Sequence, residues 1–277
     1  MPSSVTGIDY PAEYNNRARV PDHPAIMAGW ARDASAYRDA VGRRRESLRY
    51  GETERQVIDL FPPGNAAGDA TVVFIHGGYW QSFERSSFSH LARGLNLRGI
   101  AVAIPGYDLC PLVGVGDIID EMRRACRQLA ERGPLLVSGH SAGGHLAACM
   151  LATDWRALGA PPDLVQAAYA ISGLFDLRPL LSTPINDALH LTESDADRLS
   201  PLSWRPPAGC LIDAVVGGDE SAEYLRQSRT LAERWDEAGA TTRYEAVPGA
   251  NHFTVIAPLA DPDSAMTRRL AELARIG

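Results

Sequence analysis

The feature that most constrains this fold is a serine between two glycines, in the segment Gly139-His140-Ser141-Ala142-Gly143. The apolar run at 135–138 predicts a buried strand before it, and the small, apolar residues 144–151 predict a buried helix after it. So sharp a turn forces the serine into a strained backbone conformation and leaves no room for side chains two residues away. The pattern therefore predicts a hydroxyl that stands clear of a sheet, at the positive end of a helix.

Strands and helices alternate along the rest of the chain, which predicts an α/β fold with a mostly parallel central sheet and helices on both faces. Functional loops are then expected at the carboxyl ends of the strands. The expected strands are 56–61 (as an edge strand), 71–75, 100–104, 135–138, 164–172, 210–216 and 243–247. The expected helices are 88–97, 116–132, 144–151, 221–238 and 263–276.

The whole chain, residues 1–277, is expected to form a single domain. Residues 1–50 are predicted to be an N-terminal arm that packs on this domain, with helical periodicity from Pro24 to Arg49. Residues 174–204 are mixed and rich in proline, which suits a small lid or insertion over a site.

Composition excludes several classes of function. Hydrophobic residues make up 45% and charged residues 22% of the chain, enough for a sizeable core. The net charge of −7 argues against nucleic acids and anionic membranes as partners, because no basic surplus exists to displace counterions. All basic residues besides histidine are arginines, and the missing lysine rules out a Schiff base and a phosphate-loop lysine.

The cysteines, at positions 110, 126, 149 and 210, have neither metal-site spacing nor the pattern of a disulfide framework. No two histidines are spaced to hold a metal on one helix face, so we expect no metal and no cofactor. The first residues lack a signal-peptide pattern, and no apolar stretch is long enough to span a bilayer. These observations predict a cytoplasmic protein.

A serine hydroxyl needs a base to become a nucleophile, and the base needs an acid to hold its tautomer. His252 follows the last expected strand and is the candidate base. Asp219 and Glu220 lie on the turn after the preceding strand, where the acid is usual in α/β-hydrolases, and spacing alone does not decide between them. Asp176 also follows a strand, but it suits the N-cap of a short helix better.

The segment His76-Gly77-Gly78-Tyr79-Trp80 follows an apolar strand and predicts an oxyanion hole. A tetrahedral intermediate needs backbone N–H donors from this loop and one from the residue after the nucleophile, here Ala142. The glycines let the backbone approach a substrate closely. We expect His76 to anchor the loop, and His140 and His145 to be packing residues.

Several motifs together resemble the kynurenine formamidase (arylformamidase) branch of the α/β-hydrolases, and the resemblance covers nearly the whole chain. It implies the α/β-hydrolase fold, with the N–H groups of Gly78, Tyr79 and Ala142 as oxyanion donors. It also places the acid directly before residues 221–228, at Glu220. Eukaryotic members usually carry Asp at that position, so Asp219 remains the alternative acid. The motifs are Tyr14-Asn15-Asn16-Arg17, Tyr50-Gly51, His76 to Trp80, Tyr107 to Pro111, Gly139 to Gly144 and Ser221 to Ser228.

The resemblance implies hydrolysis of N-formyl-L-kynurenine, a small-molecule aryl formamide, to L-kynurenine and formate. Tyr79 and Trp80 would be walls for the aryl group, although loop packing explains Trp80 equally well. No single residue stands out as a clamp for an amino-acid head group, because many arginines could serve. A carboxylesterase with the same triad and a non-catalytic ligand-binding protein are the alternatives, and a homodimer is left open.

Overall fold

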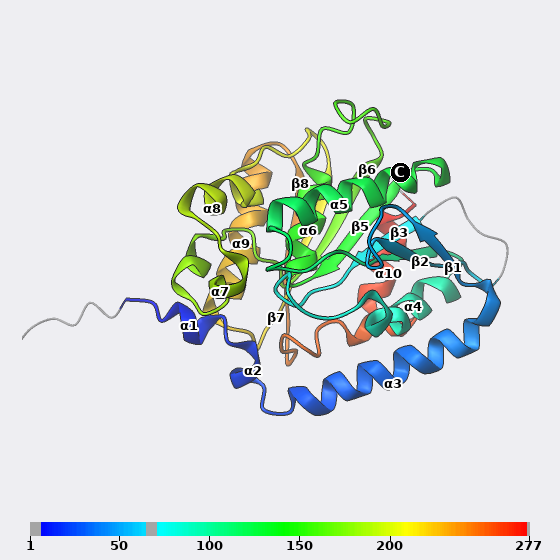
Figure 1. Ribbon diagram of the computed structural model, residues 1–277, viewed down its shortest axis with the longest axis horizontal. Helices are drawn as coiled ribbons and strands as arrows, with labels where there is room; N and C mark the ends of the chain where they lie inside the picture. The colour runs from blue at the N-terminus through cyan, green and yellow to red at the C-terminus, as the bar shows by residue number, and fades with distance from the viewer. Residues whose placement is uncertain (1–6, 65–70, 276–277) are drawn as a thin grey trace, which may run out of the picture.

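The computed structural model describes residues 7–64 and 71–275, which form an eight-stranded sheet in the order β1-β2-β4-β3-β5-β6-β7-β8 (Figure 1). The pairs β1–β2 and β2–β4 are antiparallel, and all the others are parallel. This confirms the expected mostly parallel sheet. The strands are β1 (Glu46–Arg49), β2 (Val57–Phe61), β3 (Thr71–Ile75), β4 (Ala101–Pro105), β5 (Leu135–His140), β6 (Val165–Ile171), β7 (Leu211–Gly217) and β8 (Thr241–Val247).

The edge of the sheet differs from the sequence prediction. Residues 56–61 were expected at the edge, but β2 lies between β1 and β4 and is buried along its whole length. The edge strand is β1, which lies within the stretch that was predicted to be helical as far as Arg49. Its short, polar sequence carries no strand periodicity of its own, so pairing with β2 decides its conformation.

Helices cover both faces of the sheet. Along β3, Val73 and Ile75 face a core that includes α5, α6 and α9, while Val72 and Phe74 face the core under α4 and α10. Helix α3 packs outside the second layer, against the 3-10 helix Arg85–Leu91. The helices are α1 (Tyr10–Glu13), α2 (Asn16–Arg19), α3 (His23–Val41), α4 (Ala92–Leu97), α5 (Val115–Gln128), α6 (Ala142–Leu151), α7 (Asn186–Leu189), α8 (Glu193–Leu199), α9 (Ala222–Glu237) and α10 (Ala265–Leu273).

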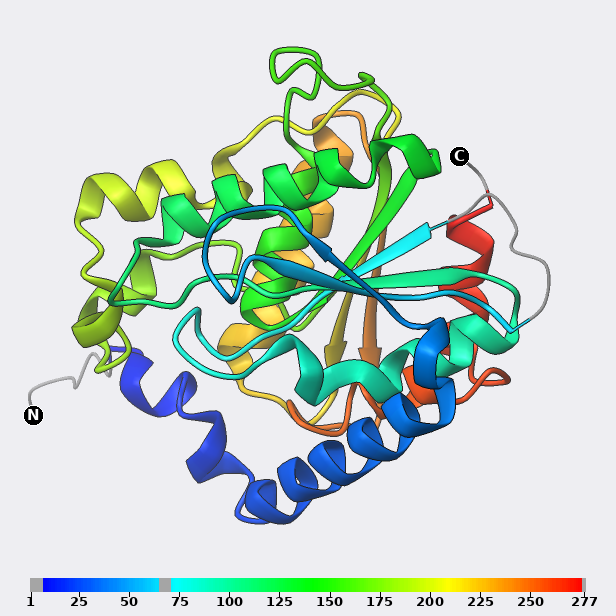
Figure 2. The same cartoon turned by 45° about the vertical axis from the view of Figure 1, so that its right-hand side comes forward.

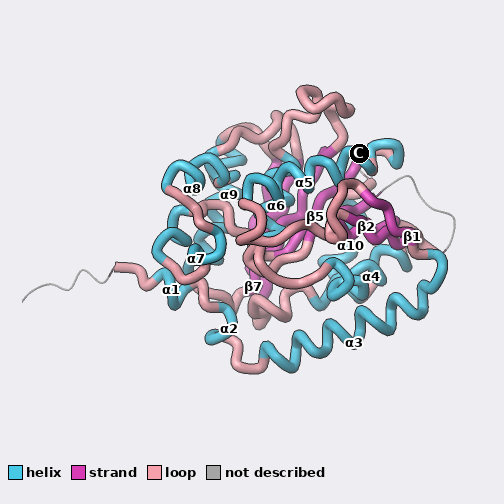
Figure 3. Tube along the Cα trace, in the orientation of Figure 1, coloured by secondary structure: helices cyan, strands magenta, loops and turns pink. Residues whose placement is uncertain are grey.

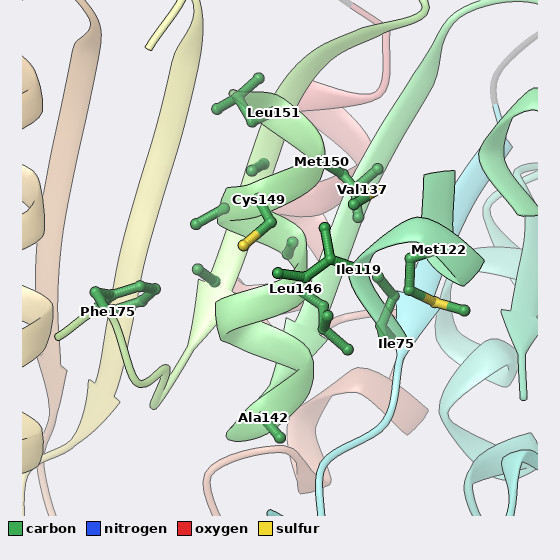
Figure 4. Packing of buried hydrophobic residues seen from close by; sticks show 14 of the residues in the cluster. Ile75, Ile119, Met122, Val137, Ala142, Leu146, Cys149, Met150, Leu151 and Phe175 are labelled. Atoms are coloured by element: carbon green, nitrogen blue, oxygen red, sulfur yellow. The ribbon is translucent and has the colours of Figure 1, made fainter. Parts of the chain in front are cut away.

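Helix α6 runs through the centre of one core, and all its residues are buried (Figure 4). Glycines allow the close approach of this helix to the sheet. A Cβ on Gly143 would lie 1.9 Å from the carbonyl oxygen of Ile75, and one on Gly139 would lie 2.1 Å from that of Gly143. The steric reason inferred from the sequence therefore applies: only glycine fits where β5 turns into α6.

Two segments reach the carboxyl ends of the parallel strands. The N-terminal arm runs past this edge, toward which the last strands point (Figure 2). Residues 174–204 form short helices, among them α7 and α8, joined by loops beside α1 (Figure 3). Within 7–64 and 71–275, none of the helices combines the length and the apolar character that a membrane crossing needs.

Candidate active site

Ser141 lies at the sharp turn between β5 and α6. Its backbone has φ 58° and ψ −120°, a region that a non-glycine residue rarely adopts. The turn is held by the N–H of Ser141, which donates to the carbonyl oxygen of Ile171 at 2.8 Å. Ser141 is also the N-cap of α6, so its hydroxyl lies at the positive end of the helix dipole.

His252 and Glu220 meet Ser141 from the loops after β8 and β7. The Nε2 atom of His252 lies 3.1 Å from Oγ of Ser141, and its Nδ1 atom lies 2.6 Å from Oε2 of Glu220. With the glutamate ionised, Nδ1 keeps its proton for the carboxylate, and Nε2 is free to accept the serine proton. Three residues that are far apart in the sequence thus form one hydrogen-bonded chain.

The second oxygen of Glu220 is also fully engaged. Oε1 accepts hydrogen bonds from the hydroxyl of Ser172 at 2.5 Å and from the N–H of Gly217 at 2.7 Å. The side chain of Glu220 has no exposed surface. Both oxygens are therefore fixed, and the carboxylate holds one orientation toward His252.

The other carboxylates predicted as possible acids lie elsewhere. Asp219 is exposed, and its backbone N–H rather than its side chain is engaged, donating to the carbonyl oxygen of Ala250. Asp176 is buried, but Arg178 holds both of its oxygens, at 2.8 and 2.9 Å. The structure thus brings Glu220, and neither of these aspartates, to His252.

The loop after β3 passes directly beside Ser141. A Cβ on Gly77 would lie 2.9 Å from Cβ of Ser141, and Gly78 has φ 107°, so both positions need glycine. Within the described residues, the N–H groups of Gly78, Tyr79 and Ala142 have no hydrogen-bond acceptor. These three predicted oxyanion donors are therefore available to an added oxygen atom.

The side chain of His76 anchors the loop after β3. Its ring lies between those of Tyr107 and Phe88, at centroid distances of 4.3 and 5.7 Å, and Nδ1 lies 2.8 Å from the carbonyl oxygen of Gly77. Burial lowers the pKa of His76 to about 4, so the ring is neutral at physiological pH. A neutral, stacked imidazole fits the anchoring role that the sequence predicted for it.

Tyr79 and Trp80 were both predicted to be substrate walls, and the structure separates them. Both have positive φ, of 50° and 57°, and their side chains take different directions. Tyr79 lines the pocket at Ser141, whereas Trp80 is fully buried and packs edge-on against His145, 5.0 Å between ring centroids. Because Trp80 does not reach the pocket, its position supports a role in packing the loop rather than in contacting a substrate.

A cluster of hydroxyl groups next to the site was not predicted from the sequence. The hydroxyl of Tyr79 donates to the carbonyl oxygen of Tyr14 at 2.7 Å and lies 2.7 Å from the hydroxyl of Tyr224. Because Tyr79 has only one proton, Tyr224 must be the donor in their contact. The amide of Asn16 also donates to Tyr224, at 3.0 Å. Burial raises the pKa of Tyr224 far above its ordinary value, so it keeps its proton.

This cluster ties the N-terminal arm to helix α9. Tyr14 donates to Glu223 at 3.0 Å and accepts from the amide of Gln227 at 2.7 Å. The ring of Tyr224 lies 4.7 Å from that of His252, so the arm and the candidate base are linked through one side chain. The motifs Tyr14 to Arg17 and Ser221 to Ser228 pointed to these segments, but not to their contact.

His140 completes the surroundings of the base. Its ring lies 4.6 Å from that of His252, and burial, with the nearby His252 as a lesser cause, holds the pKa of His140 well below its usual range. A neutral His140 adds no positive charge beside His252.

A pocket of about 440 Å³ opens above Ser141, a size typical of sites for small molecules. Its walls are mainly aromatic and apolar, and the arm, the loop after β3 and the segment 174–204 all contribute to it. The lining residues are Pro11, Tyr14, Asn15, Asn16, Arg17, Trp30, Gly77, Gly78, Tyr79, Gln81, Ser82, Phe83, Phe88, His140, Ser141, Thr183, Pro184, Ile185, His252 and Phe253.

The described part of the chain contains no group of three His, Cys, Asp or Glu side chains that could hold a metal ion. Residues 72–277 match the alpha/beta hydrolase family. The chain belongs to this family. The eight-stranded sheet and the turn at Ser141 are the structural counterpart of that match, and the protein is a hydrolase.

The relatives of this alpha/beta hydrolase include kynurenine formamidases. The chain is 32% identical over 234 residues to the kynurenine formamidase of Danio rerio. This alignment covers 81% of this chain and 80% of the relative. It is 33% identical over 238 residues to that of Salmo salar, covering 82% and 81% of the two chains. These matches confirm the resemblance seen in the motifs.

Solved structures agree on the fold. A putative thioesterase from Silicibacter superposes with a TM-score of 0.83 at 36% identity, over 96% of this chain and all of the other. Esterase B from Lactobacillus rhamnosis superposes with a TM-score of 0.65 at 22% identity, over 93% and 96% of the two chains. The second likeness, at lower identity, concerns the fold alone.

Proposed function

We propose that this hydrolase cleaves aryl formamides, with N-formyl-L-kynurenine as its substrate, through a triad of Ser141, His252 and Glu220. The single observation that carries the proposal is the hydrogen-bonded chain from Oγ of Ser141 through His252 to Glu220, at 3.1 and 2.6 Å. The kynurenine formamidase relatives at 32% and 33% identity support the choice of substrate.

The proposed reaction has two halves. Oγ of Ser141 attacks the formyl carbon while Nε2 of His252 takes the hydroxyl proton, and the new oxyanion accepts hydrogen bonds from the N–H groups of Gly78, Tyr79 and Ala142. The carbon–nitrogen bond then breaks, and His252 gives its proton to the leaving aniline nitrogen. Glu220 stabilises the imidazolium throughout this half.

Water completes the cycle. It attacks the formyl ester on Ser141 while His252 takes one of its protons. The ester bond breaks, formate leaves, and His252 returns the proton to Oγ of Ser141. An aryl amine is a better leaving group than an alkyl amine, so esterase-type machinery suffices for this formamide. The aromatic walls of the pocket, including Trp30, Phe83 and Phe88, suit an aryl group.

Ester hydrolysis is the second candidate, with the same triad. It is favoured by the 36% identity to a structure described as a putative thioesterase. Fold and triad are shared by both candidates, so only the substrate separates them.

The test compares turnover of N-formyl-L-kynurenine with that of short p-nitrophenyl esters by purified wild-type enzyme. We expect the formamide to be turned over with the higher kcat/KM. Turnover of the esters alone would remove the formamidase proposal and favour the esterase. Ser141→Ala is expected to abolish turnover of both substrates while the circular dichroism spectrum stays unchanged. Failure of a fluorophosphonate probe to label Ser141 in the wild type would favour a ligand-binding protein instead.

A further inference from the structure

Among the residues that the structure describes, one with a permanent charge lines the pocket above Ser141. This residue is Arg17, on α2, and no aspartate or glutamate of the described ranges is among the lining residues. His140 is neutral. In a chain with a net charge of −7, a pocket whose described lining has an arginine as its permanently charged group is a local exception to the overall charge.

Arg17 is also unpaired. Within the described residues, its guanidinium makes no ion pair with a carboxylate, and no hydrogen bond from its side chain is present. Arg19, two residues further along the same short helix, is by contrast bound to Glu13 at 2.6 Å. The two arginines of α2 therefore differ: one is part of the fold, and the other presents free donors at the pocket.

Three carboxylates that contact the N-terminal arm, helix α9 or the candidate base are engaged by other groups. Glu223 accepts two hydrogen bonds from Arg226, both at 2.7 Å, and Glu220 is held by His252 and its neighbours. Glu13 is occupied by Arg19 and by the N–H of Glu223. None of these three carboxylates is therefore free to compete with a ligand for Arg17.

Chemistry decides what such a site binds. Aromatic walls such as Trp30 and Phe253 hold an aryl group but cannot solvate a charge, so a charged part of the substrate must lie at the exposed, polar end of the pocket. A guanidinium with free donors binds a carboxylate through two parallel hydrogen bonds. We propose that Arg17 binds the carboxylate of the substrate, so that the enzyme selects aryl substrates that carry a carboxylate over those that lack one.

This inference rests on the proposed function in one respect, that aryl substrates are hydrolysed at Ser141. It adds a carboxylate as the recognised group of the substrate, and the residue that binds this group. In N-formyl-L-kynurenine the carboxylate belongs to the amino-acid head group, which is remote from the formyl carbon. Arg17 is therefore assigned to recognition and takes no part in bond breaking.

The test uses two aryl acetates that differ in one charge: 3-(3-acetoxyphenyl)propanoate and its neutral N-methylamide. Each is assayed with wild-type enzyme, Arg17→Gln and the control Arg43→Gln, which removes an exposed arginine that does not line the pocket. We expect Arg17→Gln to raise KM for the carboxylate ester about tenfold or more, since a hydrogen bond between charged groups is worth that much in affinity. The amide ester and the control variant should keep their wild-type KM, and kcat should change little.

Salt gives a second readout. Ionic attraction at an exposed site is screened, so the KM of the wild type for the carboxylate ester should rise between low and high ionic strength. With Arg17→Gln this salt dependence should vanish, and Arg17→Lys should restore part of it. Equal changes in KM for both esters, or no change for either, would overturn the inference.

The comparison stays decisive if the formamidase proposal fails. An enzyme that hydrolyses only esters still distinguishes the charged from the neutral acetate. The same comparison can be made without turnover. Calorimetry measures the binding of 3-phenylpropanoate and 3-phenylpropanamide to the Ser141→Ala variant and to the double variant that also carries Arg17→Gln. A preference for the carboxylate that Arg17→Gln removes supports the inference, and equal affinity for the two compounds contradicts it.

Discussion

At the scale of single residues, the sequence limits the candidate acid to two neighbouring carboxylates, and the geometry of the turn determines which of them contacts His252. Asp219 and Glu220 are neighbours on one turn, and adjacent side chains on a turn point in different directions. Glu220 turns inward, where Ser172, Gly217 and His252 bind both of its oxygens, while Asp219 faces solvent. The extra methylene of glutamate carries the carboxylate to His252 from this position.

Replacement of the acid by its amide tests this assignment. Glu220→Gln keeps the shape of the side chain but can favour the wrong tautomer of His252, so we expect kcat to fall by a factor on the order of 10⁴. Asp219→Asn makes the same chemical change one residue away and should leave kcat within about twofold, as surface changes usually do. Steady-state kinetics on one ester substrate measures both. The reverse ranking of the two variants would assign the role to Asp219.

At the scale of elements, the close packing of α6 against the sheet positions the candidate nucleophile. The helix approaches β3 so closely that Gly143 has no room for a Cβ, with the carbonyl oxygen of Ile75 at 1.9 Å from where that atom would lie. Backbone atoms cannot move aside as a flexible side chain can. A substitution there must displace α6, and Ser141 at its N-terminus would move with it.

Two helical glycines should therefore respond in opposite directions to alanine. Gly143→Ala is expected to lower the free energy of unfolding by about 2 kcal/mol or more, because overpacking forces the backbone to shift. Gly29→Ala, in α3, meets only the end of the Arg32 side chain at 3.8 Å and should raise stability by about 0.5–1 kcal/mol through helix propensity. Urea unfolding monitored by circular dichroism measures both. Equal effects at the two positions would contradict the packing argument.

At the scale of the whole molecule, buried neutral histidines make the fold sensitive to acid. His76 anchors the loop after β3, and Nε2 of His145 lies 2.8 Å from the carbonyl oxygen of Leu199. Burial lowers the pKa of each to about 4 from the ordinary value of 6.5. Between these values the unfolded chain binds protons that the folded chain does not, so acid favours unfolding.

We expect the free energy of unfolding to fall as the pH drops from about 6.5 toward 4, by about 1.4 kcal/mol per pH unit for each such histidine, and to be unaffected by these groups above pH 7. Urea unfolding at a series of pH values measures the slope. His145→Gln can keep a hydrogen bond to Leu199 without titrating, so its slope should be shallower. A stability that stays flat between pH 7 and 5 would show that these histidines titrate normally.

The sequence by itself determined the fold class and the places of the chemically important loops. Apolar runs and helical periodicity are local properties, and the steric demands of a turn at Ser141 act within a few residues, so they can be read without knowing the rest of the fold. The alternation of strands and helices then brings the loops that carry Ser141 and His252 to one edge of the sheet.

Tertiary structure alone decided which side chains meet. Contacts between distant segments decide four features: the edge position of β1, the contact of His252 with Glu220 rather than Asp219, the burial of Trp80, and the arrival of Arg17 and Asn16 at the pocket. The direction of a side chain on a turn or a short arm has no periodic signal in the sequence. It follows from the burial and hydrogen bonds that the folded chain offers, which exist only after the segments have come together.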